Sequence, residues 1–241
     1  MKHRILLVSV ASIMMFATSC SIYHPQAVDI PLINHQGDLR VDANASASVW
    51  LILPDAVNLN VTGSYGFNDW LSGQVHVNYG GENWYVQAAP GTYKTLGGKA
   101  VFETYLGLGY GGSDYENNSS NDTVAATYAY KGTYMLPFVQ FNIGWRNLGP
   151  VDIAFGLKSG AFIPNFEYHG YKADGTEKPD SYVHYETPNL LFEPQLQLGL
   201  GSDRAKFTMR VGYTWMSDLD HASNKFYHDF LTFGAGVTLC F

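Results

Sequence analysis

Cysteine, charge and long apolar runs are all scarce in this chain, and each scarcity excludes a class of protein. The 241 residues contain two cysteines, Cys20 and Cys240, so no disulfide framework is available for a small secreted fold. The 14 Lys and Arg are outnumbered by 21 Asp and Glu and form no basic stripe, which argues against nucleic acid as a partner. Beyond the first twenty residues, no apolar run reaches the roughly 18 to 20 residues of a membrane-spanning helix, which excludes a polytopic helical membrane protein.

The beginning of the chain is typical of an export signal. Lys2 and Arg4 give it a positive start, and the apolar stretch from Ile5 to Phe16 is too short to span a bilayer. We therefore assign residues 1–19 as a signal peptide and exclude them from the fold.

The next segment, residues 20–37, contains Pro25 and Pro31 and shows no periodicity. This composition predicts an extended tether that precedes a single domain over residues 38–241.

Most of the chain after the tether consists of segments in which apolar residues recur at every second position. From Leu231 to Phe241 one face is apolar and the other is small or weakly polar. Residues 204–215 and 190–201 alternate in the same way, and each segment exceeds the usual length of about five or six residues for a soluble strand. A period of two over such lengths predicts long β-strands.

Unequal connections between these strands indicate a transmembrane β-barrel rather than a soluble sandwich, because such barrels have short turns at one end and long loops at the other. The alternation predicts ten strands, with eight as the alternative because Pro90 interrupts one of them. An even number places both ends of the chain on the periplasmic side. The predicted strands are 38–51, 56–67, 70–80, 83–95, 99–111, 132–146, 151–163, 189–201, 204–216 and 229–241. Short turns are predicted near 68–69, 96–98, 147–150 and 202–203, and long polar loops near 112–131, 164–188 and 217–228.

The two faces of the predicted strands suit lipid on the outside and a polar lumen on the inside, and closure of the barrel would satisfy every backbone hydrogen bond. Membrane lipid is therefore the first expected partner. On the first three strands the outward residues are Leu39, Val41, Ala43, Leu59, Val61, Leu71, Val75 and Val77, and the inward residues are Asp42, Asn44, Asn58, Asn60, Thr62, Gln74, His76 and Asn78. Five tryptophans fall near strand ends, where aromatic girdles lie: Trp50, Trp70, Trp84, Trp145 and Trp215.

The export signal, the alternating strands and a last strand that ends in Phe241 resemble Gram-negative outer-membrane β-barrel proteins. The resemblance implies an all-β, closed antiparallel transmembrane barrel in the outer membrane. It also implies that the barrel-assembly machinery recognises the last strand, with Phe233, Val237, Leu239 and Phe241 at the apolar positions of its signal. It implies no particular activity, and we expect no cofactor.

Residues 17–20, Ala-Thr-Ser-Cys, resemble a bacterial lipobox, with Ala17 where that family usually has Leu. The resemblance implies that Cys20 is acylated and becomes the N-terminus, so that its acyl chains anchor the protein by about 0.8 kcal/mol for each buried methylene. The alternative is an ordinary secretory signal with a chance cysteine. Together with the predicted barrel, a lipobox resembles the small barrel lipoproteins.

The predicted lumen carries charges of both signs at mid-strand, on Glu103, Lys158, Glu193 and Arg210. Unpaired charges in a low-dielectric interior cost several kcal/mol each, so we expect an ionic network that plugs the lumen. A ten-stranded barrel is narrow, since open channels need about sixteen strands. A structural or surface-interaction role is therefore the main prediction, and a narrow channel for small solutes lined by the same four residues is the alternative. Further inward charges lie toward the short turns, on Arg146, Asp152, Arg204 and Lys206.

A hydrolase at the outer rim is a second alternative, because some outer-membrane barrels are enzymes. Asp218, Asp220 and His221, with His228 beyond them, could place a carboxylate against an imidazole that acts as general base. The chain contains no Gly-x-Ser-x-Gly elbow, and the spacing of its histidines fits no standard metal site. The main expectation is therefore a protein with no enzymatic activity and no metal.

The predicted loop 164–188 could bind an extracellular ligand or protein, because tyrosines with flexible neighbours form adaptable contact surfaces. Its aromatic residues are Phe166, Tyr168, Tyr171, Tyr182 and Tyr185.

Overall fold

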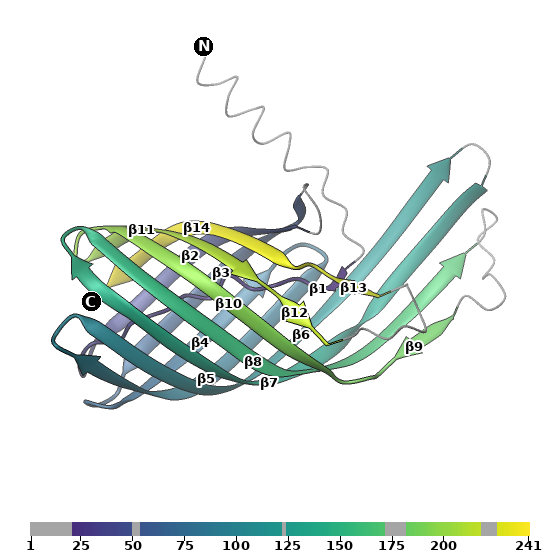
Figure 1. The fold of residues 1–241 in the computed structure, drawn as a ribbon. Coiled ribbons are helices and arrows are strands. Elements are labelled where there is room, and N and C mark those ends of the chain that lie inside the picture. Colours follow the sequence, from purple (N-terminus) through teal and green to yellow (C-terminus); the bar gives the residue numbers. More distant parts are fainter. Residues whose placement is uncertain (1–20, 50–53, 122–123, 172–181, 218–225) are drawn as a thin grey trace, which may run out of the picture.

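The computed structural model describes residues 21–49, 54–121, 124–171, 182–217 and 226–241 and shows a closed antiparallel barrel (Figure 1). Wall strands that follow one another in the chain pair side by side, and the ring closes where the last wall strand pairs with the first, from Leu231 opposite Val49 to Cys240 opposite Arg40. The ten wall strands are β2 (Leu39–Val49), β3 (Pro54–Gly66), β4 (Leu71–Tyr79), β5 (Asn83–Leu96), β6 (Ala100–Asn121), β7 (Val124–Leu148), β8 (Val151–Tyr171), β10 (Asn189–Gly201), β11 (Ala205–Tyr213) and β14 (Leu231–Cys240). Four short strands are β1 (Ser21–Tyr23), β9 (Val183–Tyr185), β12 (Trp215–Met216) and β13 (Tyr227–His228).

The predicted all-β barrel of ten antiparallel strands is confirmed, including the strand that contains Pro90. Residues 164–171 and most of 112–131 were predicted as loops, and this prediction is wrong. The ladder between β6 and β7 continues without a break from Ala100 opposite Trp145 to Asn121 opposite Val124. The many Asn, Asp and Ser residues suggested a loop, but the buried, inward Tyr115 and Tyr130 continue the alternation and belong to the extended strands.

Strands β6, β7 and β8 extend beyond the rest of the barrel at one end (Figure 1). They contain 22, 25 and 21 residues, whereas about 9 to 11 residues of a strand suffice to span a membrane. On their outward face, Lys131 pairs with Asp114 at 2.8 Å with both side chains exposed, and this hydrogen bond and the carboxylate charge raise the pKa of Lys131. An exposed ion pair indicates that this extension stands in water. We call this end the loop end, and the end with the tight turns and Phe241 the short-turn end.

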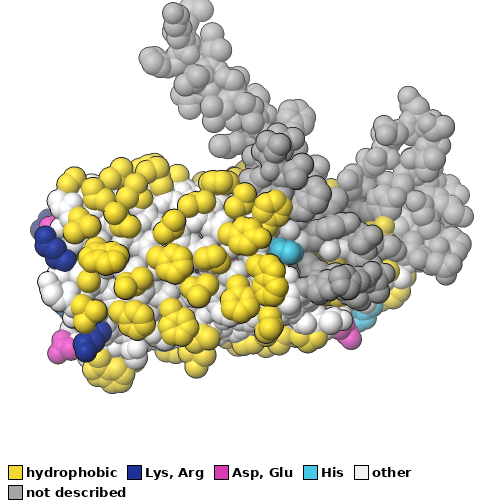
Figure 2. Space-filling view, viewed as in Figure 1, with side chains coloured by type: hydrophobic (Ala, Val, Ile, Leu, Met, Phe, Trp, Pro, Cys, Tyr) yellow, Lys and Arg dark blue, Asp and Glu magenta, His cyan; other side chains and the backbone are white. Residues whose placement is uncertain are grey.

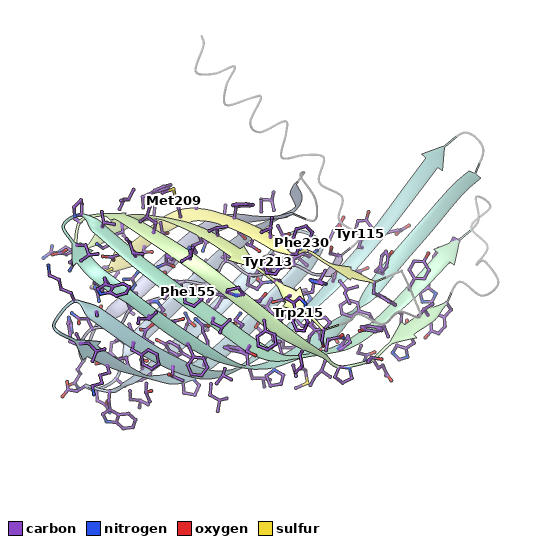
Figure 3. The ribbon with its side chains drawn as sticks, in the orientation of Figure 1. Tyr115, Phe155, Met209, Tyr213, Trp215 and Phe230 are labelled. Atoms are coloured by element: carbon purple, nitrogen blue, oxygen red, sulfur yellow. The ribbon has the colours of Figure 1, made fainter. Side chains whose placement is uncertain are left out.

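The outside of the barrel carries a band of apolar side chains, with charged side chains toward the ends of the face in view (Figure 2). Met209, Phe155 and Tyr213 project outward from the wall and are 38%, 40% and 46% exposed (Figure 3). Such a band suits lipid rather than water. Of the predicted girdle, Trp50 lies outside the described residues, and the other four tryptophans are 38% to 58% exposed. Among the described residues, no helix is both long and apolar enough to span a membrane.

The inside of the barrel has two layers. Toward the short-turn end and the middle, the inward side chains are polar or charged and buried, as the alternation predicted for Asp42, Gln74 and His76. Toward the loop end, the interior is a cluster of buried aromatic rings in which Tyr134 packs against both Phe162 and Phe166. A further element of the chain passes through this polar layer.

Candidate functional site

An extended stretch of chain before the first wall strand runs through the lumen. Every residue from Ser21 to Ile33 is buried, although only Ser21–Tyr23 belongs to a strand. We call Ser21–Asn34 the lumen segment. The stretch predicted as a tether that precedes the domain lies inside that domain, because the barrel wall surrounds it.

The lumen segment runs from the loop end to the short-turn end. At the short-turn end, the backbone amide of Ile33 donates to Glu103 at 2.6 Å. At the loop end, β1 pairs in parallel with β13, and Ser21 lies opposite Tyr227. Phe241 lies at the short-turn end, where its backbone amide donates to Leu39 at 2.9 Å. The two ends of the wall therefore share one side, as an even strand number requires, whereas the first described residue, Ser21, lies at the opposite end.

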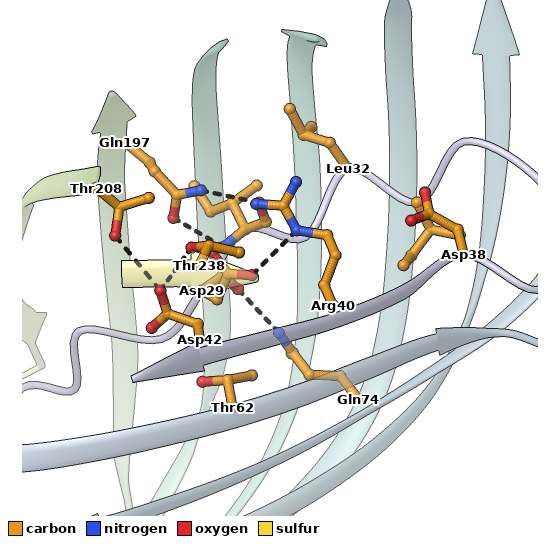
Figure 4. A network of polar contacts seen from close by, with 12 residues as sticks. Asp29, Leu32, Asp38, Arg40, Asp42, Thr62, Gln74, Gln197, Thr208 and Thr238 are labelled. Carbon is orange, nitrogen blue, oxygen red and sulfur yellow. Dashed lines mark hydrogen bonds and ion pairs between the residues drawn. The ribbon is translucent and has the colours of Figure 1, made fainter. Parts of the chain in front are cut away.

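Four buried charges at mid-lumen hold the segment to the wall (Figure 4). Asp29 of the segment accepts a hydrogen bond from Arg210 of β11 at 2.8 Å and lies 3.5 Å from Nε of Arg40 in β2. Arg210 also donates to Asp42 of β2, at 2.7 Å to Oδ2 and 3.0 Å to Oδ1. Two carboxylates thus face two guanidinium groups in a site where each residue is at most 4% exposed. The balance of charge depends on Asp29, because the wall alone supplies two cations and one anion.

Glutamine side chains of the wall replace the strand partner that the lumen segment lacks after β1. Gln197 accepts from the backbone amide of Ile30 and donates to its carbonyl, both at 3.0 Å. Gln74 donates to the carbonyl of Asp29 at 2.8 Å, and Gln195 donates to that of Val28 at 2.7 Å. A buried backbone needs such partners, since an unpaired group costs about 1 to 3 kcal/mol.

Inward glycines of the wall leave room for the lumen segment. A Cβ atom at Gly234 of β14 would lie 2.9 Å from the Cβ atom of Ala27, and one at Gly156 of β8 would lie 3.0 Å from Cδ1 of Ile30. A Cβ atom at Gly144 of β7 would lie 2.8 Å from the side chain of Leu32. The wall and the segment therefore match in shape as well as in charge.

The four charged residues predicted for the lumen are all buried there, but they do not form one network. Lys158 and Glu193 lie 3.5 Å apart, and Glu193 also accepts from Tyr23 of the lumen segment at 2.7 Å. Glu103 instead accepts from Asn142 at 2.9 Å and from the segment, and Arg210 contacts Asp29 and Asp42.

Sequence reasoning missed Asp29, Arg40 and Asp42 as partners in this site. The available signal was the alternation of Val28, Ile30 and Leu32 with polar or small residues, which is more apolar than a solvated tether requires.

Asp229, between β13 and β14, fixes the first residues of the segment at the loop end. It accepts from Ser21 at 2.6 Å and from Ser48 of β2 at 2.5 Å, and it lies 2.6 Å from Nδ1 of His24. This group resembles a Ser-His-Asp triad in composition but not in geometry, because Ser48 lies 3.3 Å from the same ring nitrogen that contacts Asp229. In the neighbouring β4–β5 turn, burial raises the pKa of Glu82, and the charge of His24 opposes this effect.

A cavity of about 30 Å³ separates the lumen segment from β8, β10 and β11 beside Lys158 and Glu193. A buried water needs roughly 10 to 15 Å³ by this kind of measure, so the cavity has room for a water molecule or two but not for a larger solute.

The predicted rim residues Asp218, Asp220 and His221 lie outside the described residues, as does Cys20. His228, their predicted partner, is in β13 and only partly exposed. Within the described ranges, no three His, Cys, Asp or Glu side chains are grouped so as to hold a metal ion.

The aromatic residues predicted as a surface loop at 164–188 mostly face inward. Phe166, Tyr168 and Tyr185 are buried, whereas Tyr182 is half exposed. The interpretation of the buried three as exposed contact residues is wrong, because they belong to β8 and β9 and pack in the aromatic cluster. The four residues predicted as an assembly signal all point outward: Phe233, Val237, Leu239 and Phe241 are 41% to 71% exposed.

Comparison with known proteins adds distant structural neighbours only, since no family model and no curated protein matches the chain. The translocator domain of the autotransporter NalP from Neisseria meningitidis aligns with a TM-score of 0.46 and 11% identity, over 86% of this chain and 90% of that one. A mutant of the monoaromatic hydrocarbon channel TodX aligns with a TM-score of 0.35 and 9% identity, over 92% and 96%. OmpT, an outer membrane protein of Vibrio cholerae, aligns with a TM-score of 0.21 and 11% identity, over 85% and 96%. Each of these TM-scores is below 0.5, so none of these likenesses supports a function for this chain. The barrel is shown by the pairing of its own strands.

Proposed function

We propose that this chain is an outer-membrane β-barrel closed by its own lumen segment, with a structural or surface-interaction role rather than transport. The buried segment Ser21–Ile33 carries this proposal, because it occupies the space that a solute would need. The apolar outer band supports a membrane location, and the exposed strands of the extension supply surface for interaction. Acylation of Cys20 belongs to the same proposal and rests on the lipobox resemblance.

Single-channel recording in planar bilayers tests the closed lumen. The purified protein should show no stable conductance steps, whereas a variant that lacks residues 22–33 should show them, because the deletion empties the polar part of the lumen and removes Ile22 and Tyr23 from the aromatic cluster at the loop end. Stable steps from the unaltered protein would overturn the proposal and support the narrow channel.

A second variant keeps the test decisive if the deletion does not assemble. Asp29→Arg places a third cation beside Arg40 and Arg210 and should expel the lumen segment while leaving the wall intact. Asp203→Asn, in the exposed turn between β10 and β11, is the matched control and should stay silent. If neither altered barrel conducts, the segment is not what closes the lumen and the proposal fails.

A further inference from the structure

We propose that the barrel carries the N-terminal end of its own chain to the cell surface, so that acyl chains on Cys20 lie in the outer leaflet of the outer membrane. The inference rests on the proposed outer-membrane location and on the threaded lumen segment. The partner it assigns is a lipid surface, and specifically the leaflet opposite the side from which the chain arrives. Cys20 is the residue directly before Ser21 in the sequence.

The direction of the segment is fixed by a series of contacts from one end of the lumen to the other. Leu32 accepts from Arg146 near the short-turn end, at 3.1 Å, and Asp29 meets Arg210 at mid-lumen. His24 and then Ser21 meet Asp229 at the loop end. Barrels of this kind place their short turns in the periplasm and their long loops outside. Ser21 is therefore at the outer end.

The segment is long enough to make this crossing. A chain of fourteen residues, from Ser21 to Asn34, can span up to about 46 Å at roughly 3.3 Å each, whereas the apolar band of such a barrel is about 25 Å tall. Successive residues of the segment contact successive levels of the wall, from one end of the lumen to the other. No reversal occurs within the described part of the segment.

The surroundings of Ser21 favour an exit at the loop end over a return through the barrel. Directly below it, Tyr23 packs edge-on against Tyr134 and Phe162, with ring centroids 5.5 and 5.4 Å away. The aromatic cluster and the segment itself fill the lumen at this level. Acyl chains need hydrocarbon, and the hydrocarbon on this side of the membrane is the outer leaflet.

Cleavage on intact cells tests the proposal. A short epitope with a site-specific protease sequence is inserted between Cys20 and Ser21, beginning with Ser so that the residue after the cysteine is unchanged. The same insert between Gly97 and Gly98 reports the short-turn end, and one that replaces residues 122–123, between β6 and β7, reports the loop end. Cells are labelled with radioactive fatty acid and treated with the protease, which does not cross the outer membrane.

We expect the insert at Cys20 to be cut on intact cells to the same extent as the one at 122–123, and the one at 97–98 to be cut only after lysis. Cleavage should remove the fatty-acid label from the barrel band on a gel. Cleavage of the Cys20 insert only after lysis would overturn the proposal. A cut insert without any fatty-acid label would overturn its lipid half.

Two measurements separate this proposal from the closed lumen on which it rests. Cys20→Ser should lose the label but keep its insert cleavable, because the chain contacts and not the lipid determine the direction. Single-channel recording of the same variants reports closure independently. If the barrel shows no conductance and its Cys20 insert is not cut on intact cells, the exit at the cell surface is refuted and the closed lumen is not. If the barrel conducts, the closed lumen is refuted.

Discussion

Replacement of Asp29 by Asn should release the lumen segment without unfolding the barrel. The variant keeps the shape of the side chain but removes one of two buried carboxylates that face Arg40 and Arg210. Arg210 retains Asp42, whereas no other carboxylate forms an ion pair with Arg40 among the described residues. Loss of one partner from a buried ion pair costs about 3 to 5 kcal/mol, because the remaining charge is left uncompensated.

This cost falls on the docked state of the segment, since an undocked segment lets water reach Arg40. Its opening equilibrium should therefore rise by roughly 100- to 5,000-fold, at about 1.4 kcal/mol for each factor of ten. The backbone amides of Ile30 and Ile33 are suitable reporters, because each donates to a wall side chain only while the segment is docked. Their hydrogen exchange in detergent micelles should accelerate by the same factor.

Wall amides provide the internal control. The amide exchange of Val77, which lies opposite Val86 in the β4–β5 ladder, should be unchanged in the variant. Asp114→Asn, which breaks the exposed pair with Lys131, should not accelerate hydrogen exchange in the lumen segment or in the wall. Acceleration of less than tenfold at Ile30 would refute the reasoning that Asp29 holds the segment. Equal acceleration in the wall would show that the segment and the barrel open together.

Three further changes test other parts of the structure. Gly234→Val should push against Ala27 and destabilise the docked segment by about 1 to 3 kcal/mol, which faster exchange at Ile30 would report and unchanged exchange would contradict. Lys206→Met leaves Asp152, 3.0 Å away, as a buried charge without its cation, and should reduce the free energy of unfolding by about 3 to 5 kcal/mol, visible as a lower temperature for the shift from folded to unfolded mobility on a detergent gel. Phe241→Ser alters a side chain that is 71% exposed, so stability in vitro should change by less than about 0.5 kcal/mol while the amount assembled in cells falls severalfold; equal losses in both would contradict a role in recognition.

The wall of the barrel could be predicted from the sequence because one physical rule applies along its whole length. Lipid outside and polar groups inside impose a period of two, and that period alone identified all ten strands. The ends of β6, β7 and β8 were the exception. In water the outward face no longer needs apolar residues, so residues 112–131 lose half of the signal although inward Tyr115 and Tyr130 maintain the other half.

The lumen segment could not be predicted in the same way, because it has no strand partner beyond β1, and its alternation is limited to Val28, Ile30 and Leu32. Its contacts come from side chains of β2, β4, β6, β7, β10 and β11, which are distant in sequence and become neighbours only once the ring closes. Asp29 has no charged neighbour in the sequence, and its two arginines are 11 and 181 residues away. Inward positions with charges of both signs predicted ion pairs. They did not indicate that one partner, Asp29, lies outside the wall.

The number of strands explains why this barrel contains a piece of its own chain. An eight-stranded barrel is just wide enough for side chains to fill, so ten strands enclose more space than their own inward residues can occupy. The inward residues here are also small where the segment passes, as at Gly144, Gly156 and Gly234. Without the segment, water would fill these gaps and surround the positive charge of Arg40. Docking of the lumen segment replaces this water by apolar side chains and by the carboxylate of Asp29. Closure of the ring and insertion of the segment are therefore expected to be coupled steps of assembly, and removal of the segment should lower the unfolding temperature of the barrel as well as open it.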